Sequence, residues 1–268
     1  MNKNKKHFSV SQLNMGIRCL EQHRRRYECG DIIPPSIALH RGIGFHKGSE
    51  YNFRQKIETD EDAPHSQIEE VAVGTLETTV KNEGIYLSPE EKTTGKAKVV
   101  EQGIAELRTG TRLYSDFIAP VIKPLFVEET VRADLDEDTE LVGRIDLIDR
   151  SKAILDLKLS SKSMNQDAVD SSPQLTMYSM LYKSKWGKKP AGLSIYNAVL
   201  KKSPEVQILN TDRQRDDYEA LMRNIQAMIK QIKNGAYTFA YGQMYAWYCN
   251  PKWCGYYSTC EGVPKYRR

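Results

Sequence analysis

Apolar residues recur at helical spacing through the first 118 residues of the chain. Leu13, Ile17 and Leu20 lie at intervals of four and three residues, after two serines, Ser9 and Ser11, that are able to cap a helix. The Ser-Pro-Glu-Glu sequence from residue 88 is a further helix start. Helices are therefore predicted from Ser9 or Ser11 onward and over residues 37–58, 69–84 and 88–118.

From residue 119 the pattern changes to short runs rich in Val, Ile and Leu. Three such runs, LFVEETVRADL, ELVGRIDLIDR and KAILDLKLS, are separated by polar turns and predict a β-meander. A helix is expected next over SPQLTMYSMLYKSKW, followed by strands over AGLSIYNAVL and EVQILN and an amphipathic helix over residues 212–234. This order predicts an α+β fold, with a mixed central sheet flanked by helices.

The length of 268 residues fits one domain. We expect a helical N-terminal part over 1–118, a sheet core over 119–211, and a long helix with a cysteine-rich tail over 212–268 that packs on the N-terminal part. Charged residues make up 28% and the net charge is only +4, so overall charge argues weakly for nucleic acid. No apolar run approaches the roughly 20 residues of a membrane span, which predicts a cytoplasmic protein without membrane contact.

Candidate chemistry centres on Asp146, Asp156 and Lys158 in the second and third predicted strands. Asp156 and Lys158 are two residues apart, so they point to one side of a strand whose other residues are apolar. Buried charges are costly unless something pairs with them, and a divalent cation such as Mg²⁺ or Mn²⁺ suits two carboxylates. Such an ion would activate water against a phosphate, with Lys158 assisting. An Asp-x-Lys sequence alone, however, occurs by chance in many proteins.

Five short motifs follow one another from Ser9 to Tyr178. They are S-x-S-x-L-x(5)-C ending at Cys19, G-x-x-F-H ending at His46, G-R-I-D ending at Asp146, D-L-K from Asp156 to Lys158, and Q-x(3)-Y from Gln174 to Tyr178. In this order and spacing the chain resembles the PD-(D/E)xK nuclease superfamily, and within it the RecB-like exonucleases. It departs from the pattern in two places, because no proline precedes Asp146 and Leu20 replaces the proline that often follows the cysteine.

The resemblance implies a restriction-endonuclease-like core and hydrolysis of DNA. It implies catalytic roles for Asp146, Asp156, Lys158, Gln174 and Tyr178, and a Mg²⁺ or Mn²⁺ ion held by His46, Asp146 and Asp156. Glu129, on the preceding strand, is a further candidate near the metal, and a solvated strand glutamate is an equal alternative.

Three cysteines, Cys249, Cys254 and Cys260, lie close together in the tail. By resemblance to the iron–sulfur subgroup of RecB-like nucleases, these and Cys19 would bind a [4Fe–4S] cluster that joins the two ends of the chain. Their spacing of four and five residues differs from the subgroup's commoner two and five. Zn²⁺ on four thiolates, Cys29 in place of Cys19, and free buried cysteines remain open.

Aromatic residues are also dense in the tail. Stacking on single-stranded bases and packing around a cluster account equally well for them. They are Tyr245, Trp247, Tyr248, Trp253, Tyr256 and Tyr257.

The function expected from these features is that of a stand-alone metal-dependent DNA exonuclease acting on single-stranded or duplex ends. Its setting would be recombination, repair or phage DNA processing, with a recombinase or helicase as a candidate partner. No nucleotide-binding P-loop is present, so the chain is not expected to unwind DNA itself. The alternatives are a structure-selective endonuclease, such as one trimming CRISPR spacer precursors, and a non-catalytic DNA-binding subunit, against which the intact acidic set argues.

Overall fold

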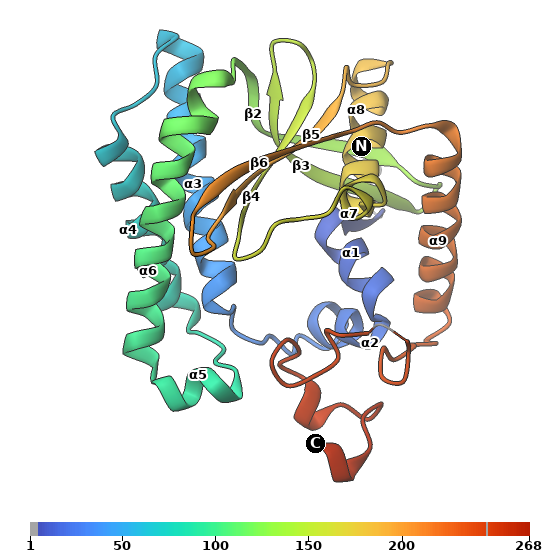
Figure 1. Cartoon of the computed structure of the whole chain (residues 1–268). Helices are drawn as coiled ribbons and strands as arrows, with labels where there is room; N and C mark the ends of the chain where they lie inside the picture. Colours follow the sequence, from blue (N-terminus) through green and yellow to red (C-terminus); the bar gives the residue numbers. More distant parts are fainter. Residues whose placement is uncertain (1–4, 245) are drawn as a thin grey trace.

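The computed structural model describes residues 5–244 and 246–268, and its centre is one mixed β-sheet (Figure 1). The sheet order is β1-β3-β4-β5-β6, with β2 on the other edge of β3. The α+β class and the mixed sheet are confirmed. The strands are β1 (Lys6–Ser9), β2 (Pro124–Asp134), β3 (Thr139–Asp149), β4 (Ile154–Ser160), β5 (Leu193–Val199) and β6 (Glu205–Thr211).

The meander predicted for the middle of the chain is present, since β2, β3 and β4 pair antiparallel in sequence order. The chain then crosses over through α7 and α8, so that β5 lies parallel to β4. Two elements were not predicted. The strand β1 pairs parallel with β3 and has only four residues, and α7 has only five, so neither is long enough to show a periodic pattern.

Helices form most of the N-terminal part, as predicted. Gly95, in a positive-φ conformation, separates α5 from α6 inside the region predicted as one helix. The last helix begins at Arg215 rather than Asp212, because Gln214 caps it. The helices are α1 (Val10–Arg18), α2 (Leu20–His23), α3 (Ile37–Thr59), α4 (His65–Glu83), α5 (Pro89–Thr94), α6 (Lys96–Leu113), α7 (Gln166–Asp170), α8 (Pro173–Trp186) and α9 (Arg215–Lys233).

Two hydrophobic clusters hold the helices against the sheet. One joins α1, α8 and α9 to it and includes Leu13, Leu181 and Ile225. The other joins α3, α4 and α6 to it and includes Phe45 and Leu107. Figure 1 shows α3, α4 and α6 together on one side of the molecule and α1, α8 and α9 on the other. Among the described helices, none has the length and apolarity needed to cross a bilayer.

After α9 the tail folds back against the N-terminal helices. The Tyr248 hydroxyl donates a hydrogen bond to the Arg18 carbonyl at 2.9 Å, and the Gln22 amide contacts the Cys254 sulfur at 3.1 Å. Trp247 and Trp253 are exposed, and Tyr245 lies outside the described residues. The two ends of the chain are therefore in direct contact.

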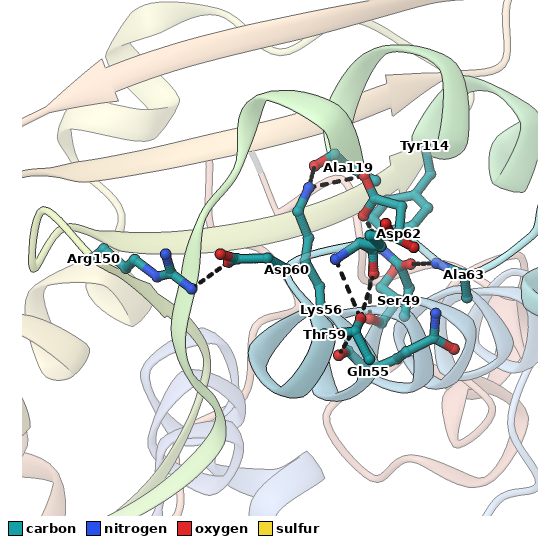
Figure 2. Close-up of polar contacts among 12 residues, drawn as sticks. Ser49, Gln55, Lys56, Thr59, Asp60, Asp62, Ala63, Tyr114, Ala119 and Arg150 are labelled. Atoms are coloured by element: carbon teal, nitrogen blue, oxygen red, sulfur yellow. Dashed lines mark hydrogen bonds and ion pairs between the residues drawn. The ribbon is translucent and has the colours of Figure 1, made fainter.

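A buried polar network fixes α3 against the segments around it (Figure 2). Asn52 is fully buried; its amide nitrogen donates to Asp62 and to the Tyr114 hydroxyl, both at 2.8 Å, and its oxygen accepts from the Ala63 N–H at 2.7 Å. The buried Lys56 ammonium donates to Asp62 at 2.8 Å and to a backbone carbonyl at 2.7 Å. Buried groups with these partners set the position of α3 along its axis.

Replacing Asn52 with alanine is expected to destabilise the protein by on the order of 2–4 kcal/mol, because the Ala63 N–H and the Tyr114 hydroxyl would lose their buried partner. Urea unfolding measures the change as a lower midpoint at an unchanged slope. Asn82→Ala, at an exposed site late in α4, is the matched control. Equal midpoints for the two variants would show that the network does not stabilise α3.

Candidate active site

The sheet opens between β3 and β4 where the two candidate aspartates lie. The strands pair at Leu147–Leu155 and at Ile148–Ile154. Asp146 and Asp156 are the next residues beyond the last pair, and the backbone N–H of Leu157 points to the Asp146 carboxylate at 3.4 Å. The other end of the same β3 edge pairs with β1. The opening therefore gives two carboxylates access to a gap inside a buried sheet.

A third carboxylate, Glu128 of β2, lies opposite Asp146. The pairs Val127–Leu147 and Glu129–Ile145 flank this position, and Glu128 has a positive φ of 53°. Glu129, the candidate from the sequence, pairs instead with Lys185 of α8 and is not in the carboxylate group. Counting back from the turn between β2 and β3 would have identified Glu128, but only once the register of that turn was known.

His46 completes a group that can hold a cation. Helix α3 carries it over β3, with Nδ1 3.5 Å from the Asp146 carboxylate. His46, Glu128 and Asp146 each offer a ligand atom, and these atoms lie within 4.8 Å of one another. Asp156 is next to this group rather than part of it. The structure thus brings His46 and Asp146 together as the resemblance implied, and adds Glu128.

Asp156 belongs to a second set of contacts with Lys158 and α8. The Lys158 ammonium lies 2.8 Å from one Asp156 oxygen, and the Gln174 amide nitrogen donates to the other at 3.2 Å. The same amide group contacts the Tyr178 hydroxyl at 3.1 Å and accepts from Lys158 at 3.3 Å. Gln174 and Tyr178, one helical turn apart, therefore hold the Asp156–Lys158 pair in place.

Crowding of buried carboxylates raises their proton affinity. Burial, followed by the charge of Asp156, raises the pKa of Asp146. Burial and the Asp146 charge raise the pKa of Glu128 to about 7, although Arg144 beside it acts in the opposite direction. Both carboxylates are therefore costly to ionise unless positive charge is added at the site.

The basic groups at the site respond to the same surroundings. Burial alone would lower the pKa of Lys158, but the Asp156 and Asp146 carboxylates outweigh it and raise that pKa, so Lys158 stays charged. Burial and the Lys158 charge lower the pKa of His46, which keeps its imidazole neutral and able to act as a ligand. Burial also raises the pKa of Tyr178, which keeps its hydroxyl protonated.

The residues present fit a divalent cation. One oxygen of Asp156 is fully buried without a hydrogen-bond partner among the described residues, because its approach to Lys158 lacks hydrogen-bond geometry. Carboxylates and a neutral imidazole are ligands for Mg²⁺ and Mn²⁺. A cation bound by His46, Glu128 and Asp146 would offset the repulsion among the carboxylates.

The four cysteines that were expected to bind a cluster lie together at a second place in the fold. Cys19, Cys249, Cys254 and Cys260 all line one small cavity between α2 and the tail. Burial and the neighbouring thiols raise the pKa of Cys249 to about 11. Cys29 is exposed and contacts Arg24 instead.

A family model described as the PD-(D/E)XK nuclease superfamily matches residues 7–261. The chain belongs to this superfamily. The match includes both ends of the fold and every residue of the site, from His46 to Tyr178. The superfamily expected from the order of the short motifs is therefore confirmed.

Solved structures of the same architecture are distant in sequence. A protein from Eubacterium rectale described as a "Putative exonuclease" is 14% identical, with a TM-score of 0.54 over 87% of this chain and 83% of that one. A protein named SSO0001 is also 14% identical, with a TM-score of 0.44 over 98% and 90%. The first supports the restriction-endonuclease-like fold. No curated protein sequence matches the chain.

Replacing Glu128 with glutamine is expected to stabilise the metal-free protein at pH 8 relative to wild type, and the gain should shrink towards pH 5. The folded-state pKa of about 7 lies above the ordinary 4.5, so the stability that Glu128 contributes is present below pH 4.5 and lost as the pH rises through 7. At about 1.4 kcal/mol per pKa unit, the gain at pH 8 reaches on the order of 3–4 kcal/mol.

Urea unfolding in EDTA at pH 5, 6.5 and 8 measures this gain. Glu129→Gln is the matched control, since its carboxylate pairs with Lys185 away from the aspartates. A gain for Glu128→Gln that does not change with pH would contradict the buried position of this carboxylate.

Proposed function

We propose that the chain is a metal-dependent deoxyribonuclease that removes nucleotides from DNA ends. The observation that carries this proposal is the placing of His46, Glu128 and Asp146 within ligand distance of one another, directly beside the Asp156–Lys158 pair. The nuclease superfamily supports hydrolysis of DNA. The whole chain would act as one nuclease domain in the cytoplasm, with Mg²⁺ or Mn²⁺ as cofactor.

Each side chain then has a defined task in phosphodiester hydrolysis. The cation, when bound, lowers the pKa of water and stabilises charge on the phosphate. His46, Glu128 and Asp146 would hold it, and Asp156 would lie directly beside it. The charged Lys158 orients the attacking water and stabilises the developing negative charge. Gln174 and Tyr178 keep Asp156 and Lys158 in position.

Asp156→Ala and Lys158→Ala are each expected to reduce cleavage of end-labelled DNA by a factor of 100 or more, because each removes a group that stabilises the transition state. Gel assays with Mg²⁺ and with Mn²⁺ measure the loss, and thermal melting checks that the variants are folded. Lys152→Ala, at an exposed turn before β4, is the matched control. Wild-type cleavage by either active-site variant would rule out this assignment.

The exonuclease and endonuclease versions of the proposal differ on closed circular single-stranded DNA. An exonuclease leaves the circle intact and degrades the same molecule once it is linearised. The exonuclease version is preferred because of the RecB-like motif order and the fold shared with a "Putative exonuclease". Cleavage of the circle would favour a structure-selective endonuclease. A recombinase or helicase partner would supply opened strands in either case.

We further propose that Cys19, Cys249, Cys254 and Cys260 bind a [4Fe–4S] cluster. Tetrahedral zinc with bonds of about 2.3 Å holds its sulfurs about 3.8 Å apart. Across the described residues, no three cysteine sulfurs lie within 4.8 Å of one another, although all four line one cavity. A cluster several atoms wide suits this wider spacing better than a single zinc ion.

Protein purified without oxygen is therefore expected to be brown and to contain iron, and Cys19→Ser is expected to lose both properties. Cys29→Ser is the matched control, because Cys29 is exposed and outside the cavity. Visible absorption and metal analysis measure the outcome. Colourless wild-type protein that contains one zinc ion per chain would contradict the iron–sulfur proposal and identify zinc as the bound metal.

A further inference from the structure

A groove runs along α1 from the active site to the cysteine-rich tail. Its first part, with a volume of about 410 Å³, is bordered by α1, β3 and the site residues Gln174 and Tyr178. Its second part, about 370 Å³, lies between α1, the start of α3 and the tail, where Trp253 forms part of the wall. Ser11, Met15 and Arg18 line both parts, so the two parts adjoin along α1.

The walls of this groove carry only positive charge. Arg144 and Arg18 line the first part, and Arg18 and Arg26 line the second. No aspartate or glutamate is among the wall residues of either part, although the chain contains 35 acidic residues. Within the described residues, Arg18 and Arg26 have no carboxylate within 4.0 Å, the ion-pair distance met by many other arginines. Arg18 donates a hydrogen bond to Gln22 and lies over the Tyr248 ring, but its charge is not neutralised by a carboxylate. Arginines without a carboxylate partner are suited to a polyanion.

Aromatic rings stand at the far end of the groove. Trp253 is 54% exposed and Tyr27 is 37% exposed, so packing does not account for their full surfaces. Hydrogen bonds fix the backbone around Trp253, because the Tyr86 hydroxyl donates to the Pro251 carbonyl at 2.5 Å and the Tyr256 hydroxyl donates to the Asp31 carbonyl at 2.5 Å. A held, exposed ring is a surface on which an unpaired base can stack.

Helix α3 leaves room between the groove and the metal site. Leu39 lines the groove, and His46 lies two helical turns further on. Gly42 falls between them on the same helix face, and a side-chain carbon placed there would meet no atom within 4 Å. The passage from Trp253 to the carboxylates is therefore not blocked at this point of α3.

We propose that this groove binds a single strand of DNA, with bases stacked on Trp253 and phosphates bound by Arg18 and Arg26, and directs it past Gly42 to the metal site. The inference rests on the proposed nuclease function and specifies its substrate as a strand that is unpaired for several nucleotides from the point of cleavage. A stacking surface is useful only where bases are free of their partners, which is why a paired duplex is excluded as the occupant.

Equilibrium binding of fluorescein-labelled dT15 in EDTA, read by anisotropy across a salt series, tests the groove without cleavage. Trp253→Ala is expected to weaken binding roughly 5- to 100-fold, the loss of one stacked base. Arg18→Gln is expected to weaken binding and to lower the slope of log affinity against log salt by about 0.7, the loss of one phosphate contact on a single strand. A purely structural arginine would not change that slope.

Matched controls come from exposed residues outside the groove. Tyr266→Ala, in the same tail, and Arg223→Gln, on α9, are expected to keep wild-type affinity and slope. Thermal melting confirms that all four variants are folded. Binding of dT15 within twofold of wild type by both groove variants, or equally tight binding of a blunt 15-base-pair duplex by wild type, would overturn the inference.

The outcome is separable from that of the cleavage assay. If Asp156→Ala abolishes cleavage but the groove variants bind normally, the nuclease function stands and only the groove assignment fails. If the groove variants lose binding but wild-type protein cuts no DNA, the groove stands as a single-strand site and the nuclease function fails.

Discussion

Electrostatic repulsion among buried carboxylates is the constraint on which the rest of this structure depends. Glu128, Asp146 and Asp156 come from three adjacent strands and meet where β3 and β4 separate. Lys158 offsets part of that repulsion at Asp146, while burial, followed by the charge of a neighbouring carboxylate, raises the pKa values of Asp146 and Glu128. A site with surplus negative charge and a neutral imidazole beside it is prepared for a divalent cation.

Keeping such a site inside the sheet requires rigid support from both layers of helices. Helix α3 is seated closely on α4, since a side-chain carbon at Gly44 would lie 2.6 Å from the Ala72 carbonyl oxygen. That close packing, with the Asn52 network further along the helix, determines where His46 stands. On the other face, α8 supplies Gln174 and Tyr178 from a helix whose middle part is buried in the core. Stability and chemistry thus use different faces of the same helices.

The contact between the chain ends relates the tail to the active site. Cys254 lines both the cysteine cavity and the groove, and the neighbouring Trp253 faces the groove. A metal centre bound by the four cysteines would also fix this wall of the groove, along which a DNA strand would run. The proposed cluster would in this way support the wall of the proposed strand-binding groove.

Local pattern predicted the long helices and the meander, because periodicity and strand alternation are short-range properties of the chain. It made Asp146, Asp156 and Lys158 candidates only. The resemblance added His46, Gln174 and Tyr178, which the structure brings to the same site. Short elements such as β1 and α7 were missed because they have no period to detect. Glu128 was missed in favour of Glu129 because the choice depends on the register of β2 against β3, in which Glu128 lies opposite Asp146.

The choice between Cys19 and Cys29 likewise depended on contacts across more than 200 residues. The sequence by itself therefore determined the class of fold and the acidic motif, because both depend on the spacing of residues that are close together in the chain. Only the tertiary structure decided which carboxylates meet and that α1 and the tail together line a groove, because both depend on register between strands and on the packing of distant segments.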